Sequence, residues 1–584
     1  MAATFQKIPT SCKFLCYCRT NYNRKTTFMK PYKFLLPLLV TILASCTEDK
    51  IIPINGDSVE NVSDTTADRS VSIVFSNNAD AIVSGTGDNV TATVNGNGVT
   101  VTNSGSEKIT YYVSGTTGDG YLKIYSGRKQ CIVLNNASIT NSQGAAINVQ
   151  GPADTPNKGK RVDLLLQGDN SLTDGVTYSN TPSDEDEKGT LFSEGQIVVS
   201  GSGALTVKAN GKSGIVSDDW VQFVSGTVNV QSAAGHGVKS NDYILVSGGN
   251  LDIRVTADGK KGFTSDSLVR FEGGTTTMTI SGNTVVTTDN GTRDTSSTAG
   301  VKADQLFEMI DGTLSISNSG RGGKGINCDG PAHFQGGNVT ITVTGQNYGS
   351  SGGGGGWWGG GNNSNNSVAA KGIKVDGALD ISGGIITVTA SNHEGIETKS
   401  TLTISGGEVY SQSSDDAINA ASDMTISGGY VCAHSTGNDG LDANGNLYIK
   451  GGVVYAIGKT SPEMAIDANT EGGKKFYLQG GTLIAIGNLE NGSQLSQPCY
   501  QATSWTKNAW YAITSNEKTY AFKTPSGGGQ KLIVSWGSQQ PTLTSGISVS
   551  NGTERCNAML NEDPQTSGGS NVNLSTYTSD GGWH

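Results

Sequence analysis

Short apolar stretches alternate with polar positions in a unit of about 22 to 25 residues, which repeats from near residue 195 to near residue 488. In one unit, Leu402 and Ile404 alternate with the polar Thr403 and Ser405, and a pair of glycines follows. Alternation with a period of two predicts a strand that turns one face to the core, and glycine readily adopts the backbone of the next turn. The glycine pair recurs at residues 248–249, 273–274, 336–337, 383–384, 406–407, 428–429 and 451–452.

A second motif follows the glycine pair after another short strand. Its last four copies are Gly395-Ile-Glu-Thr398, Ala417-Ile-Asn-Ala420, Gly440-Leu-Asp-Ala443 and Ala465-Ile-Asp-Ala468. Each unit thus contains three short strands, and the glycine pair and the second motif keep constant positions within it. This predicts an all-β fold: a single-stranded parallel β-helix (solenoid) of ten or more rungs with terminal caps. An antiparallel β-sandwich is the alternative, but nothing in a sandwich would preserve both registers over ten units.

Breaks in the repeat divide the chain into five expected parts. They are an upstream segment with a signal peptide (1–45), a tether (46–70), N-terminal β segments with the first rungs (71–195), the repeats (196–488), and C-terminal strands with a cap (489–584). Insertions at 281–299 and 346–367 interrupt the repeats. The second insertion is rich in Gly and Asn and cannot contribute to a packed core.

The N-terminal segment has the pattern of a lipoprotein signal. A basic start at Met29, the expected true first residue, precedes an apolar stretch at 34–43 that is too short to cross a membrane. Leu43-Ala-Ser-Cys46 then has the form of a lipobox, which predicts cleavage before Cys46 and lipid attachment to it. We therefore expect a lipid-anchored protein at the outer membrane or cell surface. A chance apolar leader is the alternative.

Charge and cysteine content exclude some partners. The formal net charge of −11 argues against nucleic acid. No Cys-x-x-Cys motif occurs in the mature region, so a zinc site is not expected. Whether Cys499 and Cys556 form a disulfide stays open, and we expect a monomer.

Acidic residues gather in the last four repeats. When the second motifs are aligned, Glu397, Asn419, Asp442 and Asp467 occupy one outward position, and strands about 4.8 Å apart would stack them. Like charges about 5 Å apart repel by roughly 3 kcal/mol, which a hard cation with oxygen ligands removes. A solvated acidic face or ordinary Asp and Asn turns are the alternative. The candidate Ca²⁺ ligands are Glu394, Glu397, Asp415, Asp416, Asn419, Asn438, Asp439, Asp442 and Asp467.

Four segments carry a family resemblance: residues 134–147, Gly214-Ile-Val-Ser-Asp-Asp219, Ile404-Ser-Gly-Gly407 and Asn438-Asp-Gly-Leu-Asp-Ala-Asn-Gly445. They resemble the bacterial β-helical carbohydrate-binding proteins known for binding calcium and polygalacturonate. The resemblance covers roughly residues 75–490 and implies a right-handed, pectate-lyase-like β-helix that holds calcium at rung edges.

Two further segments are similar to the Asp-Asp-x-x-Asp calcium motif of one pectate lyase family. They are Asp415-Asp416-x-x-Asn419 and Asn438-Asp439-x-x-Asp442, and each has one Asp replaced by Asn. Metal binding is therefore carried over to these residues, and catalysis is not.

The resulting hypothesis is calcium-dependent binding of an acidic, pectic polysaccharide without efficient cleavage. Lys374 and Lys399 are weak candidates for a lyase base and also for carbohydrate contacts, because they lie in register with the acidic residues. Trp357 and Trp358 could stack on sugar rings or dock on the wall of the fold. A calcium-dependent polysaccharide lyase, and an adhesin or stalk without catalytic activity, remain the alternatives.

Overall fold

The computed structural model describes residues 67–579 except 180, 290–291, 350–366 and 517. All of these belong to the second of two compact units, Asn61–His584. The described residues form strands and loops, with no helix among them. Accordingly, this part of the chain contains no helix long and apolar enough to cross a membrane.

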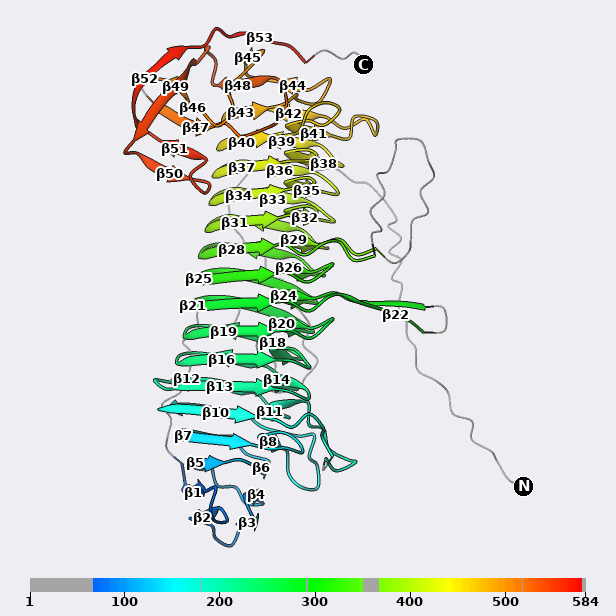
Figure 1. Ribbon diagram of the computed structural model, residues 1–584, viewed down its shortest axis with the longest axis vertical. Helices are drawn as coiled ribbons and strands as arrows, with labels where there is room; N and C mark the ends of the chain where they lie inside the picture. The colour runs from blue at the N-terminus through cyan, green and yellow to red at the C-terminus, as the bar shows by residue number, and fades with distance from the viewer. Residues whose placement is uncertain (1–66, 180, 290–291, 350–366, 517, 580–584) are drawn as a thin grey trace, which may run out of the picture. The chain divides into compact units, whose positions relative to one another are not determined.

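A sheet of 15 strands runs through the repeats, and Figure 1 shows its strands stacked one above another. All neighbours in it are parallel except its first pair. In spatial order its strands are β3 (Val90–Asn95), β4 (Gly98–Asn103), β6 (Tyr121–Ser126), β8 (Ile147–Gln150), β11 (Gly189–Ser193), β14 (Ser213–Ser217), β17 (Val238–Ser240), β20 (Lys261–Ser265), β24 (Ala299–Ala303), β26 (Lys324–Cys328), β29 (Lys371–Val375), β32 (Ile396–Thr398), β35 (Ile418–Ala420), β38 (Leu441–Ala443) and β41 (Ile466–Ala468).

A second sheet of 30 strands packs against the same core. Its strands are β1 (Arg69–Phe75), β2 (Ile82–Ser84), β5 (Ile109–Thr117), β7 (Gln130–Thr140), β9 (Val162–Gln167), β10 (Asp169–Thr173), β12 (Ile197–Gly201), β13 (Ala204–Ala209), β15 (Val221–Phe223), β16 (Thr227–Ser232), β18 (Tyr243–Val246), β19 (Asn250–Val255), β21 (Leu268–Ile280), β25 (Leu306–Asn318), β27 (Ala332–Phe334), β28 (Asn338–Val343), β30 (Leu379–Ile381), β31 (Ile385–Ala390), β33 (Leu402–Ile404), β34 (Glu408–Ser413), β36 (Met424–Ile426), β37 (Tyr430–Ser435), β39 (Leu447–Ile449), β40 (Val453–Ile457), β42 (Phe476–Leu478), β43 (Thr482–Ile486), β44 (Gln494–Leu495), β45 (Cys499–Ala502), β48 (Leu532–Trp536) and β53 (Ser575–Tyr577).

Each later repeat supplies one strand to the 15-stranded sheet and two to the 30-stranded sheet, as β32, β33 and β34 do. The equivalent strands of the next repeat are their parallel neighbours: β32 pairs with β35, β33 with β36 and β34 with β37. Between β33 and β34 the chain turns at the glycine pair, where Gly407 has a φ of +77° that a side chain would strain. A Cβ atom there would also lie 2.8 Å from the Gly384 carbonyl oxygen of the preceding repeat.

One continuous apolar core lies between the two sheets, as period-two alternation requires. Phe263 stacks on Phe223 and on Phe271, with ring centroids 6.1 Å apart in both pairs. Ile396 and Thr398 are both fully buried. The side chain of Glu397 between them therefore points away from the core.

The all-β class is confirmed, but the prediction of a right-handed single-stranded parallel β-helix with terminal caps is wrong: the described strands form four sheets, and two of these are antiparallel and separate from the parallel strands. The described residues begin with the antiparallel pairs β1–β2 and β3–β4, and β22 (Val285–Asp289) and β23 (Thr292–Ser296) form a separate antiparallel hairpin. The fourth sheet is antiparallel and consists of β46 (Trp510–Ser515), β47 (Lys518–Lys523), β49 (Thr542–Ser550), β50 (Thr553–Arg555), β51 (Leu560–Glu562) and β52 (Gln565–Asn571).

This six-stranded sheet packs beside the last repeats. Tyr455 of β40 is fully buried against Phe522, with ring centroids 5.4 Å apart, and its hydroxyl donates to the Lys523 carbonyl oxygen at 2.9 Å. The Cys556 backbone N–H donates to Glu408 Oε1 of β34 at 2.6 Å. Cys499 and Cys556 are both free thiols, so the pairing left open by the sequence is not made.

Replacing Glu408 with Ala should loosen the six-stranded sheet, because the buried Cys556 amide loses its acceptor and Arg555 loses a carboxylate 3.7 Å away. We expect a loss of about 1–3 kcal/mol and faster proteolytic cleavage after residue 489. Limited proteolysis with mass spectrometry checks this. Glu272→Ala, which removes an ion pair on β21, is the control. Equal cleavage in both variants would contradict the expectation.

Candidate functional site

One face of the 15-stranded sheet carries a continuous column of residues, one from each strand between β6 and β41. We call it the outer column because its members in the repeats point away from the core. They are Lys123, Asn148, Phe192, Val216, Lys239, Thr264, Lys302, Asn327, Lys374, Glu397, Asn419, Asp442 and Asp467. Neighbouring members are about 4.8 Å apart along the stack. The column is therefore basic in its middle part and acidic over its last strands.

Four aspartates and one glutamate form a carboxylate cluster at the acidic end: Asp416, Asp439, Asp442, Asp467 and Glu490. The Asn419 amide links two of them, donating to Asp416 Oδ2 at 3.0 Å and to Asp442 Oδ2 at 2.7 Å. Asp416 Oδ1 also accepts from the Asp439 backbone N–H at 3.2 Å. Within the described parts of the chain, no lysine, arginine or histidine forms an ion pair with these five residues.

Burial and mutual repulsion make the cluster hard to ionise. Burial, followed by the charges of neighbouring carboxylates, raises the pKa of Asp439 to about 7 and that of Asp442 to about 8. For Asp416, burial and the nearby Asp415 raise the pKa to about 6 although the Asn419 hydrogen bond opposes the shift. Burial and a hydrogen bond with Glu490 raise the pKa of Asp467. A bound cation would favour the charged forms instead.

Glu394 and Glu397, predicted as metal ligands, lie beside lysines. Lys371 Nζ is 3.2 Å from Glu394 Oε2 and 2.5 Å from Glu397 Oε2, and Lys399 also pairs with Glu397. Burial opposes ionisation of Glu397, which is 1% exposed, but the charges of Lys371 and Lys399 hold its pKa below the usual value. Its charge is thus balanced without a metal.

Lys371 was not predicted from the sequence, which singled out Lys374 and Lys399 as the lysines in register with the acidic residues. The sequence nevertheless contains a pattern that points to Lys371. Lys324 and Lys371 are register partners at the start of β26 and β29, and Lys261 starts β20. An internal row of lysines thus flanks the outer column beside its basic part.

A second group joins Asp415 to His393 and Glu394. Their ligand atoms all lie within 4.8 Å of one another, and His393 Nδ1 is 3.0 Å from Asp415 Oδ2. Asn438 Nδ2 donates to Asp415 Oδ1 at 2.9 Å. Burial lowers the pKa of His393, and a neutral imidazole is a competent metal ligand. The sequence singled out Glu394, Asp415 and Asn438, but not His393.

The remaining predicted residues are placed as follows. Lys374 lies next to Glu397 in the outer column, and its Nζ is 2.6 Å from Asp376 Oδ1. Since Lys399 pairs with Glu397, both candidate bases are held by carboxylates. Trp357, Trp358 and Cys46 lie outside the described residues.

Comparison with known proteins gives three findings. A family model described as "Carbohydrate-binding domain-containing protein" matches residues 95–347 and 358–489. A protein of the same description from Acetivibrio thermocellus is 29% identical over 125 residues, which are 21% of this chain and 42% of that protein. The chain thus spans less than half of that relative's length.

A solved structure titled as the polysaccharide lyase-like protein from C. thermocellum, a gadolinium derivative, is 24% identical. It covers 45% of this chain and 96% of its own, with a TM-score of 0.36. The family model, by contrast, matches more than half of the chain. The protein described here therefore belongs to the family of carbohydrate-binding domain-containing proteins.

Proposed function

We propose that the protein binds an acidic, pectin-like polysaccharide through calcium held by the carboxylate cluster. One observation carries the proposal: Asp416, Asp439, Asp442 and Asp467 are stacked, largely buried and free of ion pairs within the described residues. Natural proteins pair buried charges or use them to bind metal ions. Family membership supports a carbohydrate as the ligand.

The donor set fits calcium better than other common ions. Carboxylates and amide carbonyls are the hard oxygen ligands that Ca²⁺ prefers, and six to eight of them are needed. Asn419 donates both described hydrogen bonds through Nδ2, so its Oδ1 is available as a further ligand. Ligands from neighbouring strands suit the flexible coordination of Ca²⁺ better than the octahedral demand of Mg²⁺.

Charge explains why the metal and the polysaccharide should bind together. The protein carries a formal net charge of −11, and a polyuronate is also negative, so the two repel without a bridging cation. Carboxylates of the polymer could complete the coordination shell of calcium at the cluster. Lys374, two positions along the outer column from Asn419, would have to exchange Asp376 for a carboxylate of the polymer in order to contribute.

Cleavage of the polysaccharide is the second candidate. β-Elimination needs a free basic group beside the sugar C5 proton, as well as calcium on the carboxylate. Lys374 and Lys399 both pair with protein carboxylates, which favours binding without turnover. A surface adhesin or stalk is the alternative in which no acidic glycan binds.

The proposal includes lipid attachment at Cys46, outside the described residues, which would place the binding face at the cell surface. Cys46→Ala should move the protein from the membrane fraction to the soluble fraction. Retention in the membrane would contradict lipid anchoring and leave the binding proposal standing.

Polygalacturonate binding tests the central claim. Isothermal titration with calcium should show binding that chelator abolishes, and Asp442→Asn should weaken it at least tenfold. Asp380→Asn is the matched control, because Asp380 lies on β30 of the other sheet and is partly exposed. Binding that survives chelator would contradict calcium bridging. New ultraviolet absorbance from an unsaturated uronide would instead establish the lyase.

A further inference from the structure

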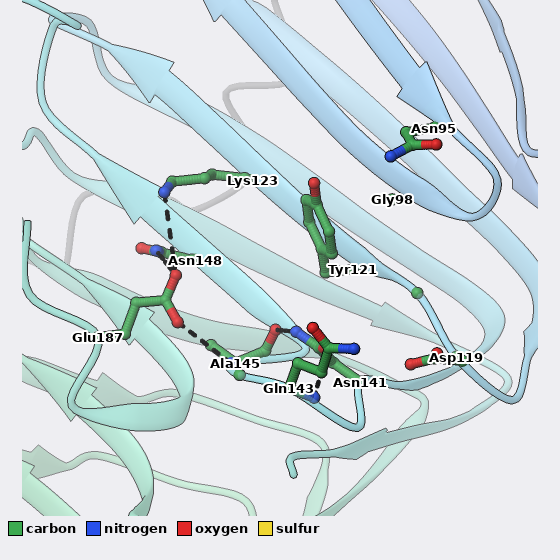
Figure 2. Close-up of a pocket in the computed structure, with 12 residues that line it drawn as sticks. Asn95, Gly98, Asp119, Tyr121, Lys123, Asn141, Gln143, Ala145, Asn148 and Glu187 are labelled. Atoms are coloured by element: carbon green, nitrogen blue, oxygen red, sulfur yellow. Dashed lines mark hydrogen bonds and ion pairs between the residues drawn. The ribbon is translucent and has the colours of Figure 1, made fainter. Parts of the chain in front are cut away.

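A pocket of about 280 Å³ lies at the N-terminal end of the 15-stranded sheet, many strands away from the carboxylate cluster. Figure 2 shows side chains from β3, β6 and the loop after β7 around it, with Glu187 reaching in from the loop before β11. Its volume is just below the range of about 300–1,000 Å³ typical of drug-sized ligands, which suits a single sugar residue.

Part of the pocket wall is fixed by hydrogen bonds. Glu187 is 9% exposed and accepts from Asn148 Nδ2 at 2.7 Å and from Thr181 Oγ1 at 3.2 Å. Asn141 Nδ2 donates to the Ala145 carbonyl oxygen at 2.7 Å and shapes the adjoining loop. Buried polar groups held in this way present a prearranged set of acceptors to a ligand.

Other polar groups in the pocket are uncommitted. Neither the Asn95 amide nor the Tyr121 hydroxyl makes a side-chain hydrogen bond in the described structure. The Asp119 carboxylate accepts from Ser142 through Oδ1 alone. These three groups come from different loops and strands, and together they could bind several hydroxyls of one ring.

The Tyr121 ring gives the pocket an apolar surface. It is partly exposed, and Gly98 on the neighbouring strand leaves room for it, because a Cβ atom at Gly98 would lie 2.7 Å from a ring carbon. Aromatic rings combine a large apolar face with a polar edge. The C–H face of a pyranose could stack on such a ring while its hydroxyls meet the polar groups.

The charge of the pocket selects among sugars. Lys123 is the one cation among the twelve residues that line it. It is 8% exposed, pairs with Glu185 and lies 3.9 Å from Glu187, so it is not free to bind a uronate. The exposed Asp119 would repel a uronate further.

We infer that this pocket binds a single neutral pyranose residue, stacked on Tyr121 and hydrogen-bonded by Asn95, Asp119 and Glu187. The site works without calcium and is separate from the carboxylate cluster. The protein would thus hold an acidic stretch of a glycan at one end of the outer column and a neutral residue at the other.

Saturation-transfer NMR with the methyl glycosides of galactose, glucose and rhamnose tests this inference on the full chain. At least one glycoside should show transfer in the presence of chelator. Tyr121→Ala and Asn95→Ala should each weaken its binding at least fivefold, whereas Asp442→Asn should not. Tyr112→Ala is the matched control, since Tyr112 is a 46% exposed tyrosine on β5 that does not line the pocket.

Three results would overturn the inference: no transfer to any of the three glycosides, transfer unchanged by both pocket variants, or stronger transfer to galacturonic acid. The first two leave calcium-dependent binding at the carboxylate cluster untouched, and Asp442→Asn shows whether any galacturonic acid is held at that cluster instead. Circular dichroism of Tyr121→Ala confirms that the variant is folded, and the exposed Asn95 offers a second variant that leaves the core untouched.

Discussion

Calcium should raise the thermal unfolding midpoint of the protein, and EDTA should lower it. A ligand that binds only the folded state stabilises it by mass action, by about 2.7 kcal/mol when free calcium is 100 times the dissociation constant. Differential scanning calorimetry with calcium, and then with excess EDTA, measures the effect. The same midpoint in both conditions would contradict a calcium site in the carboxylate cluster.

The stability of the calcium-free protein should depend on pH, and it should decrease as the pH rises. The folded-state pKa is about 6 for Asp416, about 7 for Asp439 and about 8 for Asp442, all above the unfolded value of about 3.9. A raised pKa contributes stability that is complete below pH 4 and is lost as the pH rises through the folded value. Without calcium, the thermal unfolding midpoint should therefore decrease as the pH is raised from 5 to 8, because these three aspartates ionise over that range. Calcium should counteract that fall, because it binds the ionised forms.

Asp442→Asn separates the two effects. In EDTA at pH 8 it should stabilise the protein by up to about 3 kcal/mol, because one repulsion between close carboxylates disappears. Calcium should stabilise the Asp442→Asn variant much less than it stabilises the wild-type protein, because one ligand is gone. Asp380→Asn should change neither the stability in EDTA nor the stabilisation by calcium. An Asp442→Asn variant that is destabilised in EDTA would show that the carboxylate is held by protein contacts instead.

The four aspartates of the carboxylate cluster could be predicted because repeat and register are linked, whereas Glu490, which follows the last repeat, was not predicted. When the second motifs align in the sequence, their strands pair in the same register, so Asn419 and Asp442 become neighbours. Alignment of the second motifs alone does not show that Lys371 pairs with Glu397, although the row of lysines that starts β20, β26 and β29 marks Lys371 as a candidate. Lys371 lies three residues before Lys374, and reaches Glu397 across the strand pair. Whether a lysine turns to a neighbouring strand depends on side-chain packing that the period does not encode.

The pocket near the first described strands and the six-stranded sheet could not be predicted in this way, for another reason. The neutral-sugar pocket takes Asn95 from the end of β3 and Asp119 and Glu187 from two connections of unequal length, with no repeat to align them. The six-stranded sheet depends on hairpins such as β46–β47, where Asn516 has a φ of +49°. Such turns are local signals. The sequence predicts C-terminal strands with a cap for 489–584, but not that these strands form a sheet of their own.

Glu397→Gln should destabilise the protein by about 3–5 kcal/mol, the usual cost of breaking a buried ion pair from one side. Lys371 is 8% exposed and would lose its nearest carboxylate, keeping only Glu394 at 3.2 Å. Urea unfolding in EDTA measures the loss. Glu272→Gln is the control, since its pair with Arg270 is more exposed and should contribute only about 0–1 kcal/mol.

A double variant decides whether Glu397 acts as a lysine partner or as a calcium ligand. If it balances Lys371, the change Lys371→Met combined with Glu397→Leu should recover part of the stability lost in Glu397→Gln, because the pair is removed from both sides and Glu394 keeps only its contact with His393. Calcium stabilisation should then persist, since Asp416, Asp439, Asp442 and Asp467 are intact. If Glu397 is instead a ligand, Glu397→Gln keeps wild-type stability in EDTA and loses the calcium effect. That outcome would move the metal site toward Glu394 and His393, whose side chains are already in contact.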